Sequence, residues 1–190
     1  MILYLAEAMT KAEAIDEAAR SRLVAILFER NDPVDSIVTA FIKRVRAQGV
    51  RVSGLTQEPG AGEDEVFMRD LDTGETFAIM QDLGAAAEGC AVDPAQIAIG
   101  AQRLDAARAR RPDLLVVNRF GRLEAEGGGM RAEIAAAIAE GLALLIAVPT
   151  RFLDAWNEFA GGLDTQAPPT EAALSAWWDG IAPLQSDAST

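Results

Sequence analysis

The chain has 190 residues, 50% of them hydrophobic, which is enough to bury the core of one domain. Its 17 basic and 29 acidic side chains give a net charge of −12, so the surface repels a phosphate backbone and we expect no nucleic-acid partner. The sequence contains no histidine, which excludes Ser-His and Cys-His catalysis and removes the commonest transition-metal ligand.

The first buried elements form a strand-helix-strand unit. The continuous apolar run Leu23–Phe28 is typical of a strand buried on both faces. Asp32 in cap position and Pro33 in the first turn predict a helix that Gly49 ends. A second strand, 50–57, follows, and this order predicts a parallel sheet with a right-handed crossover.

The middle of the chain inserts a hairpin before the next helix and strand. Residues 66–81 alternate in hydropathy and turn at 72–74, which predicts a β-hairpin. After an irregular connector, Asp93 caps a helix that has Pro94 in its first turn. The apolar run 113–118 then predicts another buried strand.

The last third continues the alternation. Its pattern predicts a helix over 129–141, a buried strand over 142–148, a glycine-stopped helix over 149–162 and a final helix within 167–184. The sequence therefore predicts an α/β fold, an open and mostly parallel sheet of about five strands flanked by helices, with an inserted β-hairpin.

Three segments divide the chain. We expect an N-terminal helical extension over 1–22, with Thr10 and Glu13 as a capping box, and an α/β domain over 23–163. Residues 164–190 should supply a C-terminal helix and a flexible tail.

Ligands in open α/β sheets bind at the carboxyl ends of the strands, beside the point where the strand order reverses. Three segments of the sequence fall at such ends: 29–36, 118–131 and 148–151.

The segment after the first strand departs from a phosphate-binding loop. Glu29 and Val34 stand where glycines belong, Asp35 replaces the lysine, and Ser36 alone keeps the pattern. The later strand ends in Asn-Arg at 118–119, where an acid should order magnesium and another should activate water. We therefore expect neither the usual nucleotide pose nor hydrolysis by the usual route.

The segment NRFGRLEAEGGGMR, with GCAVDPAQIA before it and AWNEFAGG after it, resembles the bacterial domain of unknown function 2478 family. The strand RVSGLTQ and the hairpin before QDLG also fit, so the resemblance covers residues 23–163. That family is similar to small P-loop nucleoside-triphosphatases of the THEP type, with an eroded phosphate loop. Its members are often encoded near molybdate transport and molybdoenzyme functions. The resemblance thus implies a P-loop-like α/β fold and a link to molybdenum metabolism, and it supplies no catalytic residue.

Two interpretations of the loop at 118–131 stay open. In the first, Asn118, Arg119 and Arg131 form an anion clamp, and the glycines at 127–129 present free N–H groups at a helix start. In the second, Arg119 pairs with a glutamate of the same loop, and the glycines make a flexible turn.

The acidic side chains of the candidate segments also have two interpretations. Asp32 and Asp35 either contact a cation or ribose, or cap the helix and favour its first turn, and Ser36 either caps or donates to a ligand. Glu124 and Glu126 are either acid, base or magnesium ligands, or solvated partners of nearby arginines.

The remaining side chains of interest favour packing. Trp156 shares helical spacing with two phenylalanines and indicates a core position. Trp177 and Trp178 cannot both be buried on one narrow helical face, so we expect one of them to contact another subunit in a homo-oligomer. Cys90 has no cation beside it, and we interpret it as a packed residue in a reducing compartment. No leader or membrane-spanning stretch is evident, so we expect a cytoplasmic protein.

Our first hypothesis is a non-hydrolysing protein that binds a small anionic ligand, a nucleotide or an oxyanion, with its cofactors unknown and no metal site assigned. The alternatives are a magnesium-dependent nucleotide hydrolase or transferase, and a structural or partner-binding protein without a small ligand. The expected ligand-binding residues are Asp32, Asp35, Ser36, Asn118, Arg119, Glu124, Glu126, Gly127, Gly128, Gly129 and Arg131.

Overall fold

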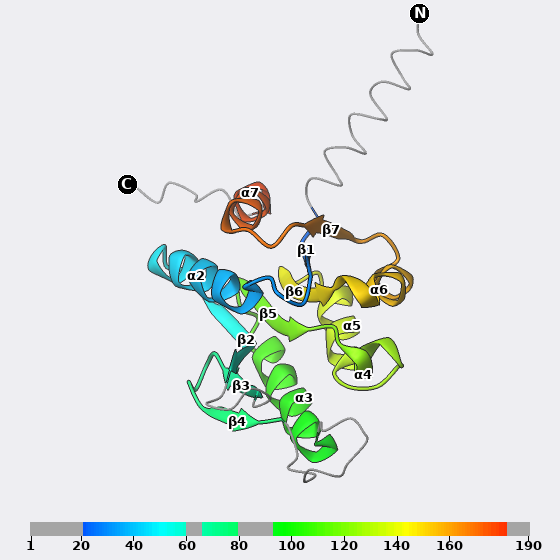
Figure 1. Ribbon diagram of the computed structural model, residues 1–190. Coiled ribbons are helices and arrows are strands. Elements are labelled where there is room, and N and C mark those ends of the chain that lie inside the picture. The colour runs from blue at the N-terminus through cyan, green and yellow to red at the C-terminus, as the bar shows by residue number, and fades with distance from the viewer. Residues whose placement is uncertain (1–20, 60–65, 80–92, 182–190) are drawn as a thin grey trace, which may run out of the picture.

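The computed structural model describes residues 21–59, 66–79 and 93–181 (Figure 1). The expected N-terminal helix with its Thr10 cap, Cys90 and the tail after 181 lie outside the described residues.

Seven strands form one sheet in the order β4-β3-β2-β5-β6-β1-β7. The hairpin pairs, β2 with β3 and β3 with β4, are antiparallel, and the other pairs are parallel. The predicted fold class, an open α/β sheet with an inserted hairpin, is therefore confirmed. The elements are β1 (Leu23–Phe28), α2 (Val34–Ala47), β2 (Val52–Pro59), β3 (Val66–Asp70), β4 (Thr76–Ala78), α3 (Pro94–Ala109), β5 (Leu114–Arg119), α4 (Arg122–Ala125), α5 (Arg131–Ala139), β6 (Leu144–Pro149), the 3-10 turn η1 (Thr150–Phe152), α6 (Leu153–Ala160), β7 (Asp164–Ala167) and α7 (Glu171–Ile181).

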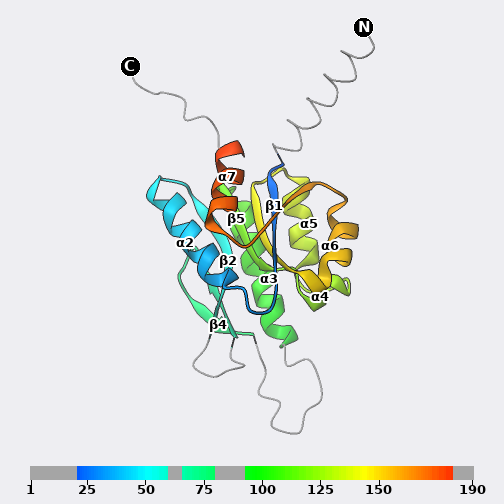
Figure 2. The same ribbon diagram turned by 45° about the horizontal axis from the view of Figure 1, so that its top comes forward.

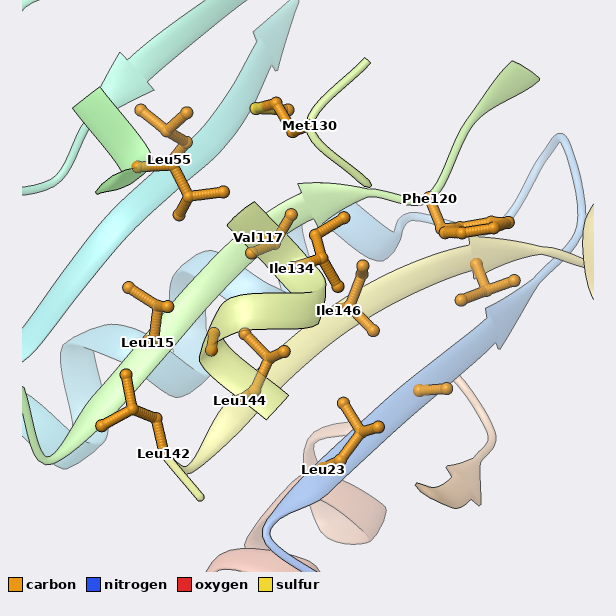
Figure 3. Close-up of a cluster of buried hydrophobic side chains, with 14 of the residues drawn as sticks. Leu23, Leu55, Leu115, Val117, Phe120, Met130, Ile134, Leu142, Leu144 and Ile146 are labelled. Atoms are coloured by element: carbon orange, nitrogen blue, oxygen red, sulfur yellow. The ribbon is translucent and has the colours of Figure 1, made fainter. Parts of the chain in front are cut away.

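The buried strands are apolar on both faces because each face carries its own core. Successive residues of a strand point to opposite sides, so Leu115 and Val117 belong to one cluster and Leu114 and Val116 to the other. In the first cluster, Ile134 of α5 lies over Val117 and Ile146 of neighbouring strands (Figure 3). Because both faces of these strands are buried, their sequences are continuous apolar runs.

Helices cover both faces of the sheet (Figure 2). The first cluster includes buried residues of α3, α5 and α6, and the second includes those of α2 and α7. Helices α2 and α7 lie side by side (Figure 1). The predicted burial of Trp156 is confirmed, since its side chain is 0% exposed within the first cluster.

The expectation that Trp177 and Trp178 cannot both be buried is wrong. Their side chains are 6% and 4% exposed, and their rings lie 5.9 Å apart. Helix α7 contacts both α2 and β7, so two adjoining sides of the helix are covered instead of one narrow stripe. Trp177 Nε1 also donates a hydrogen bond to the carbonyl of Ser21, 2.8 Å away.

Two short elements differ from the expected linker and loop. β7 pairs in parallel with β1, from Leu23 opposite Asp164 to Ile26 opposite Ala167. Only Ala167 of β7 is buried, so this strand lacks the hydropathy pattern of a buried strand. Helix α4 forms within the expected loop after β5.

The cap of α3 and the hairpin turn agree with the expectations from the sequence. Asp93 caps α3 as predicted, because its carboxylate accepts the N–H of Ala95. The hairpin turn is held by Asp70, which accepts the N–H groups of Asp72 and Thr73 and pairs with Arg103 of α3.

Candidate functional site

The carboxyl ends of β1, β5 and β6 meet at one edge of the sheet, where Phe28 lies opposite Pro149 and Arg119 lies opposite Ala147. After β1 the chain crosses to β2, which lies on one side of β1 in the sheet, whereas β7 lies on the other side of β1. The strand order therefore reverses at β1. A cleft of about 530 Å³ opens there. Its lining residues are Phe28, Glu29, Arg30, Asp32, Asp35, Arg119, Pro149, Thr150 and Arg151.

The turn between β1 and α2 is closed by its own hydrogen bonds. Glu29 N donates to Asp32 Oδ2 at 2.7 Å, and Asp32 N donates to Glu29 O at 3.0 Å. The interpretation of Asp32 as the helix cap is therefore wrong: Pro33 holds the cap position of α2, and no side chain caps it. The carboxylate of Asp32 instead accepts the N–H of Glu29. The turn therefore differs from a phosphate-binding loop, whose glycines leave backbone N–H groups free to bind phosphate.

A β-bulge decides which way the end of β5 points. The register of β5 against β6 shifts between Val117 and Arg119. Regular alternation from Val117 would send Asn118 to the α2 face and Arg119 to the opposite face. The bulge exchanges them. Asn118 Nδ2 donates to Gln57 Oε1 at 2.6 Å, and Arg119 reaches α2.

Arg119 forms an ion pair with Asp35 of α2, with 2.9 Å between Nη2 and Oδ2. The expectation that Arg119 pairs with Glu124 or Glu126 is wrong, because the bulge turns its side chain away from that loop. The guanidinium also lies over the ring of Phe28, 5.0 Å from the centroid. Its Nε is buried and has no hydrogen-bond partner within the described part of the chain.

Two further arginines line the cleft, and neither is among the ligand-binding residues expected from the sequence. Arg30 follows β1 and Arg151 follows β6, and both side chains are exposed. Neither has a carboxylate partner in the residues that the structure describes, and Arg151 lies over the ring of Phe152 at 4.9 Å. Their signal was positional, since each stands within two residues of a strand end that was already a candidate.

The cleft is electrostatically balanced inside an acidic chain. Its three arginines face three carboxylates, those of Glu29, Asp32 and Asp35. Glu29 accepts a hydrogen bond from Thr150 Oγ1 at 2.7 Å. With a net charge of −12 over the whole sequence, this neutral lining repels an anion less than the chain does on average, and two of its guanidiniums have no carboxylate partner among the described residues.

Glu124 organises the glycine turn after β5. Its buried carboxylate accepts Gly121 N at 2.9 Å and Met130 N at 3.0 Å, where α5 begins. Gly127 N and Gly128 N donate to the carbonyls of Glu124 and Leu123. The turn thus satisfies these N–H groups internally, and a side chain of the protein already occupies the start of α5.

The remaining expected ligand-binding residues lie apart from the cleft lining. Glu126 pairs with Arg122, and Arg131 donates to the carbonyl of Glu124 while lying over the ring of Phe159. Ser36 is exposed on α2 beyond the lining. The structure brings together Asp32, Asp35 and Arg119, and the binding roles of the other residues stay predictions.

Within residues 21–59, 66–79 and 93–181, no group of three or more cysteine, aspartate or glutamate side chains is placed to hold a metal ion. In the same residues, none of the helices combines the length and the apolar character that crossing a membrane requires.

A parallel sheet covered by helices on both faces, with a strand, turn and helix where the strand order reverses, defines a doubly wound α/β fold. The solution structure of a human cancer-related nucleoside triphosphatase has this fold, with a TM-score of 0.59 and 13% identity over 88% of this chain and 99% of that chain.

The chain belongs to the family described as protein of unknown function (DUF2478), whose model matches residues 23–177. It is 37% identical over 179 residues to the molybdenum import ATP-binding protein ModC 2 of Bradyrhizobium diazoefficiens. The matched stretch is 90% of this chain and 20% of that protein, so the chain spans about a fifth of the relative's length. The predicted family resemblance and P-loop-like fold are confirmed.

Proposed function

We propose that this protein binds a nucleotide, or a smaller oxyanion, in the cleft between β1, β5 and β6, and that it does not hydrolyse the ligand. The observation that carries the proposal is the convergence of Arg30, Arg119 and Arg151 from three separate parts of the chain on one cleft. Guanidiniums bind phosphate and related oxyanions through paired hydrogen bonds. The cleft lies at the carboxyl ends of β1, β5 and β6, and ligands of open α/β sheets bind at such ends, which supports the proposal.

The size of the cleft favours a nucleotide over a bare oxyanion. A volume of about 530 Å³ is in the range of pockets that enclose a small organic ligand, and a tetrahedral oxyanion fills only part of it. The relative named as a molybdenum import ATP-binding protein supports both choices, ATP and molybdate. Molybdate is therefore the alternative ligand of the same cleft.

We expect no hydrolysis because two positions of the phosphate-binding pattern carry side chains of the opposite charge. Asp35 stands where a phosphate-binding loop has its lysine, and its carboxylate is held by Arg119, which stands where the strand-end acid belongs. The side chains that order magnesium and align the attacking water are thus replaced by an internal ion pair.

A thermal-shift screen with ATP, GTP, molybdate, tungstate and phosphate, with and without magnesium, tests the proposal. A ligand at a hundredfold excess over its Kd should raise the Tm by about 5–10 °C. Arg151→Ala should remove most of the shift. Arg22→Ala, which deletes an exposed arginine just before β1, at the opposite edge of the sheet, should leave it intact.

Phosphate release in the same samples separates binding from catalysis. A shift without phosphate release supports the proposal. Magnesium-dependent release that is lost in Asp35→Asn or Glu124→Gln would contradict it and support the hydrolase alternative. No shift with any compound would contradict binding in this cleft.

A further inference from the structure

A second cleft lies on the α2 face of the sheet, beside the hairpin. Its volume is about 360 Å³. We call it the Lys43 cleft, and its lining residues are Thr39, Ile42, Lys43, Arg46, Thr56, Glu58, Arg69 and Leu71.

The cleft follows from the geometry of one helix and two strands. Thr39, Ile42, Lys43 and Arg46 recur at three- and four-residue spacing, so they form one stripe along α2. The side chains of β2 and β3 that alternate with the α3-side residues Leu55 and Met68 point to the α2 face. Helix α3 lies against β2 on the other face, and among the described helices α2 alone supplies lining residues of the cleft.

The lining carries three cations against one carboxylate, in a chain whose net charge is −12. Arg69 and Glu58 form an ion pair. Arg46 Nη2 donates to the carbonyls of Val52 and Leu71, which fixes its position, and no carboxylate of the described residues forms an ion pair with it. The cleft therefore has a net positive lining in a chain that is acidic overall.

Two polar groups of the cleft have no partner among the described residues. Neither the Lys43 ammonium nor the Thr56 hydroxyl has a hydrogen-bond or ion-pair partner in the part of the chain that the structure describes. Thr56 is 6% exposed, so its hydroxyl is held in a wall of the cleft and not in open solvent. Ile42 and Leu71 add apolar surface beside them.

We propose that the Lys43 cleft binds a small organic anion, a carboxylate or phosphate carried on an apolar body. Lys43 supplies the free charge, Arg46 the fixed charge and Thr56 a hydroxyl donor, while Ile42 and Leu71 cover the body of the ligand. The site goes beyond the proposed nucleotide cleft, because Lys43 lies about 12 Å along α2 from Asp35.

The lysine content of the chain allows a site-specific test. The sequence has two lysines, Lys11 and Lys43, and Lys43 alone lies in the described part. Protein labelled with 13C at the lysine ε carbon gives two side-chain signals, and Lys43→Arg assigns one of them by its loss. Phenyl phosphate and benzoate are the probes, inorganic phosphate tests the need for an apolar body, and benzyl alcohol is the uncharged control.

We expect both aromatic anions to shift the Lys43 signal saturably and to leave the Lys11 signal in place. Lys43→Gln should weaken their binding about tenfold, as measured by the shifts of neighbouring backbone amides. Arg151→Ala in the other cleft should leave the shift unchanged, so this test does not depend on the proposed nucleotide site. The amide spectrum of each variant verifies that it is folded.

Three results would overturn the assignment. The Lys43 signal could fail to move at millimolar concentrations of the probes, or it could move equally with benzyl alcohol, which would exclude an anion site. Equal affinity for inorganic phosphate and phenyl phosphate would exclude the apolar contribution.

Discussion

Arg119 and Asp35 form an ion pair of 2.9 Å at the edge of the sheet, although 84 residues separate them in the chain. The β-bulge at the end of β5 turns Arg119 to the α2 face, and the first turn of α2 presents Asp35 to it. The pair thus links the first turn of α2 to the end of β5.

Asp35→Asn should tighten anion binding. The substitution removes a carboxylate from the cleft and frees the guanidinium of Arg119, so the Kd of the ligand should fall by about threefold to tenfold. Calorimetric titration measures the change. Asp179→Asn, on the exposed side of α7, removes the same charge elsewhere and should leave the Kd unchanged. Weaker binding in Asp35→Asn would show that the carboxylate contacts the ligand directly.

Gly129→Ala should be far more destabilising than Gly141→Ala. Both glycines have left-handed backbones, with φ of 61° and 67°, and they flank the same helix, α5. A Cβ at Gly129 would lie 2.1 Å from Glu124 Oε1, whereas a Cβ at Gly141 meets nothing within 4 Å. We expect a loss of about 1 kcal/mol for Gly141→Ala and about 3 kcal/mol for Gly129→Ala, measured by urea unfolding. Equal losses would mean that Glu124 does not hold the turn.

Asp70→Asn should destabilise the protein at neutral pH and much less in acid. Burial alone would raise the pKa of Asp70, but hydrogen bonds from Thr73 N, Asp72 N and Arg103 outweigh it and lower the pKa. A lowered folded-state pKa gives stability that is present above the unfolded value of about 3.9 and is lost as the pH falls below it.

Urea unfolding of wild type and Asp70→Asn measures this difference. We expect about 1–3 kcal/mol at pH 7 and a narrowing gap below about pH 4. Asp179→Asn is again the control. A gap that stays constant with pH would show that Asp70 contributes through packing and not through its charge.

Trp178→Ala should lower the free energy of unfolding by about 3–5 kcal/mol without changing the oligomeric state. The residue is 4% exposed within the core cluster that α7 shares with α2 and the sheet, so its loss leaves a cavity within this protein and no gap between subunits. Urea unfolding measures the first effect and sedimentation velocity the second. Dissociation of an assembly, or a small loss of stability, would contradict the packing of α7.

The sequence predicted the layered α/β fold because its strongest signals are local. Continuous apolar runs, the Asp93 cap and the hairpin turn each depend on residues close in the chain. β7 could not be predicted, because three of its four residues face partly into solvent and its pairing with β1 supplies the stability. Trp177 and Trp178 were misjudged for a similar reason, since two neighbouring elements cover α7.

The position of the candidate site could be predicted from the sequence, but the pairing of its side chains could not. The carboxyl ends of β1, β5 and β6 meet as the topology requires. A bulge after Val117 determines which residues pair there. No residue type in the sequence indicates this bulge. Glu124 was expected to contact a ligand, and the sequence did not indicate that its carboxylate accepts two backbone N–H groups.

The arginines of the first cleft should bind an anion without hydrolysing it. This is measured by calorimetric titration of ATP into wild type, Arg151→Ala and Arg22→Ala, followed by assay of free phosphate with and without magnesium. We expect one site, at least about tenfold weaker binding in Arg151→Ala, unchanged binding in Arg22→Ala and no phosphate release. Equal binding by the two variants, or ATP turnover by the wild type, would contradict it.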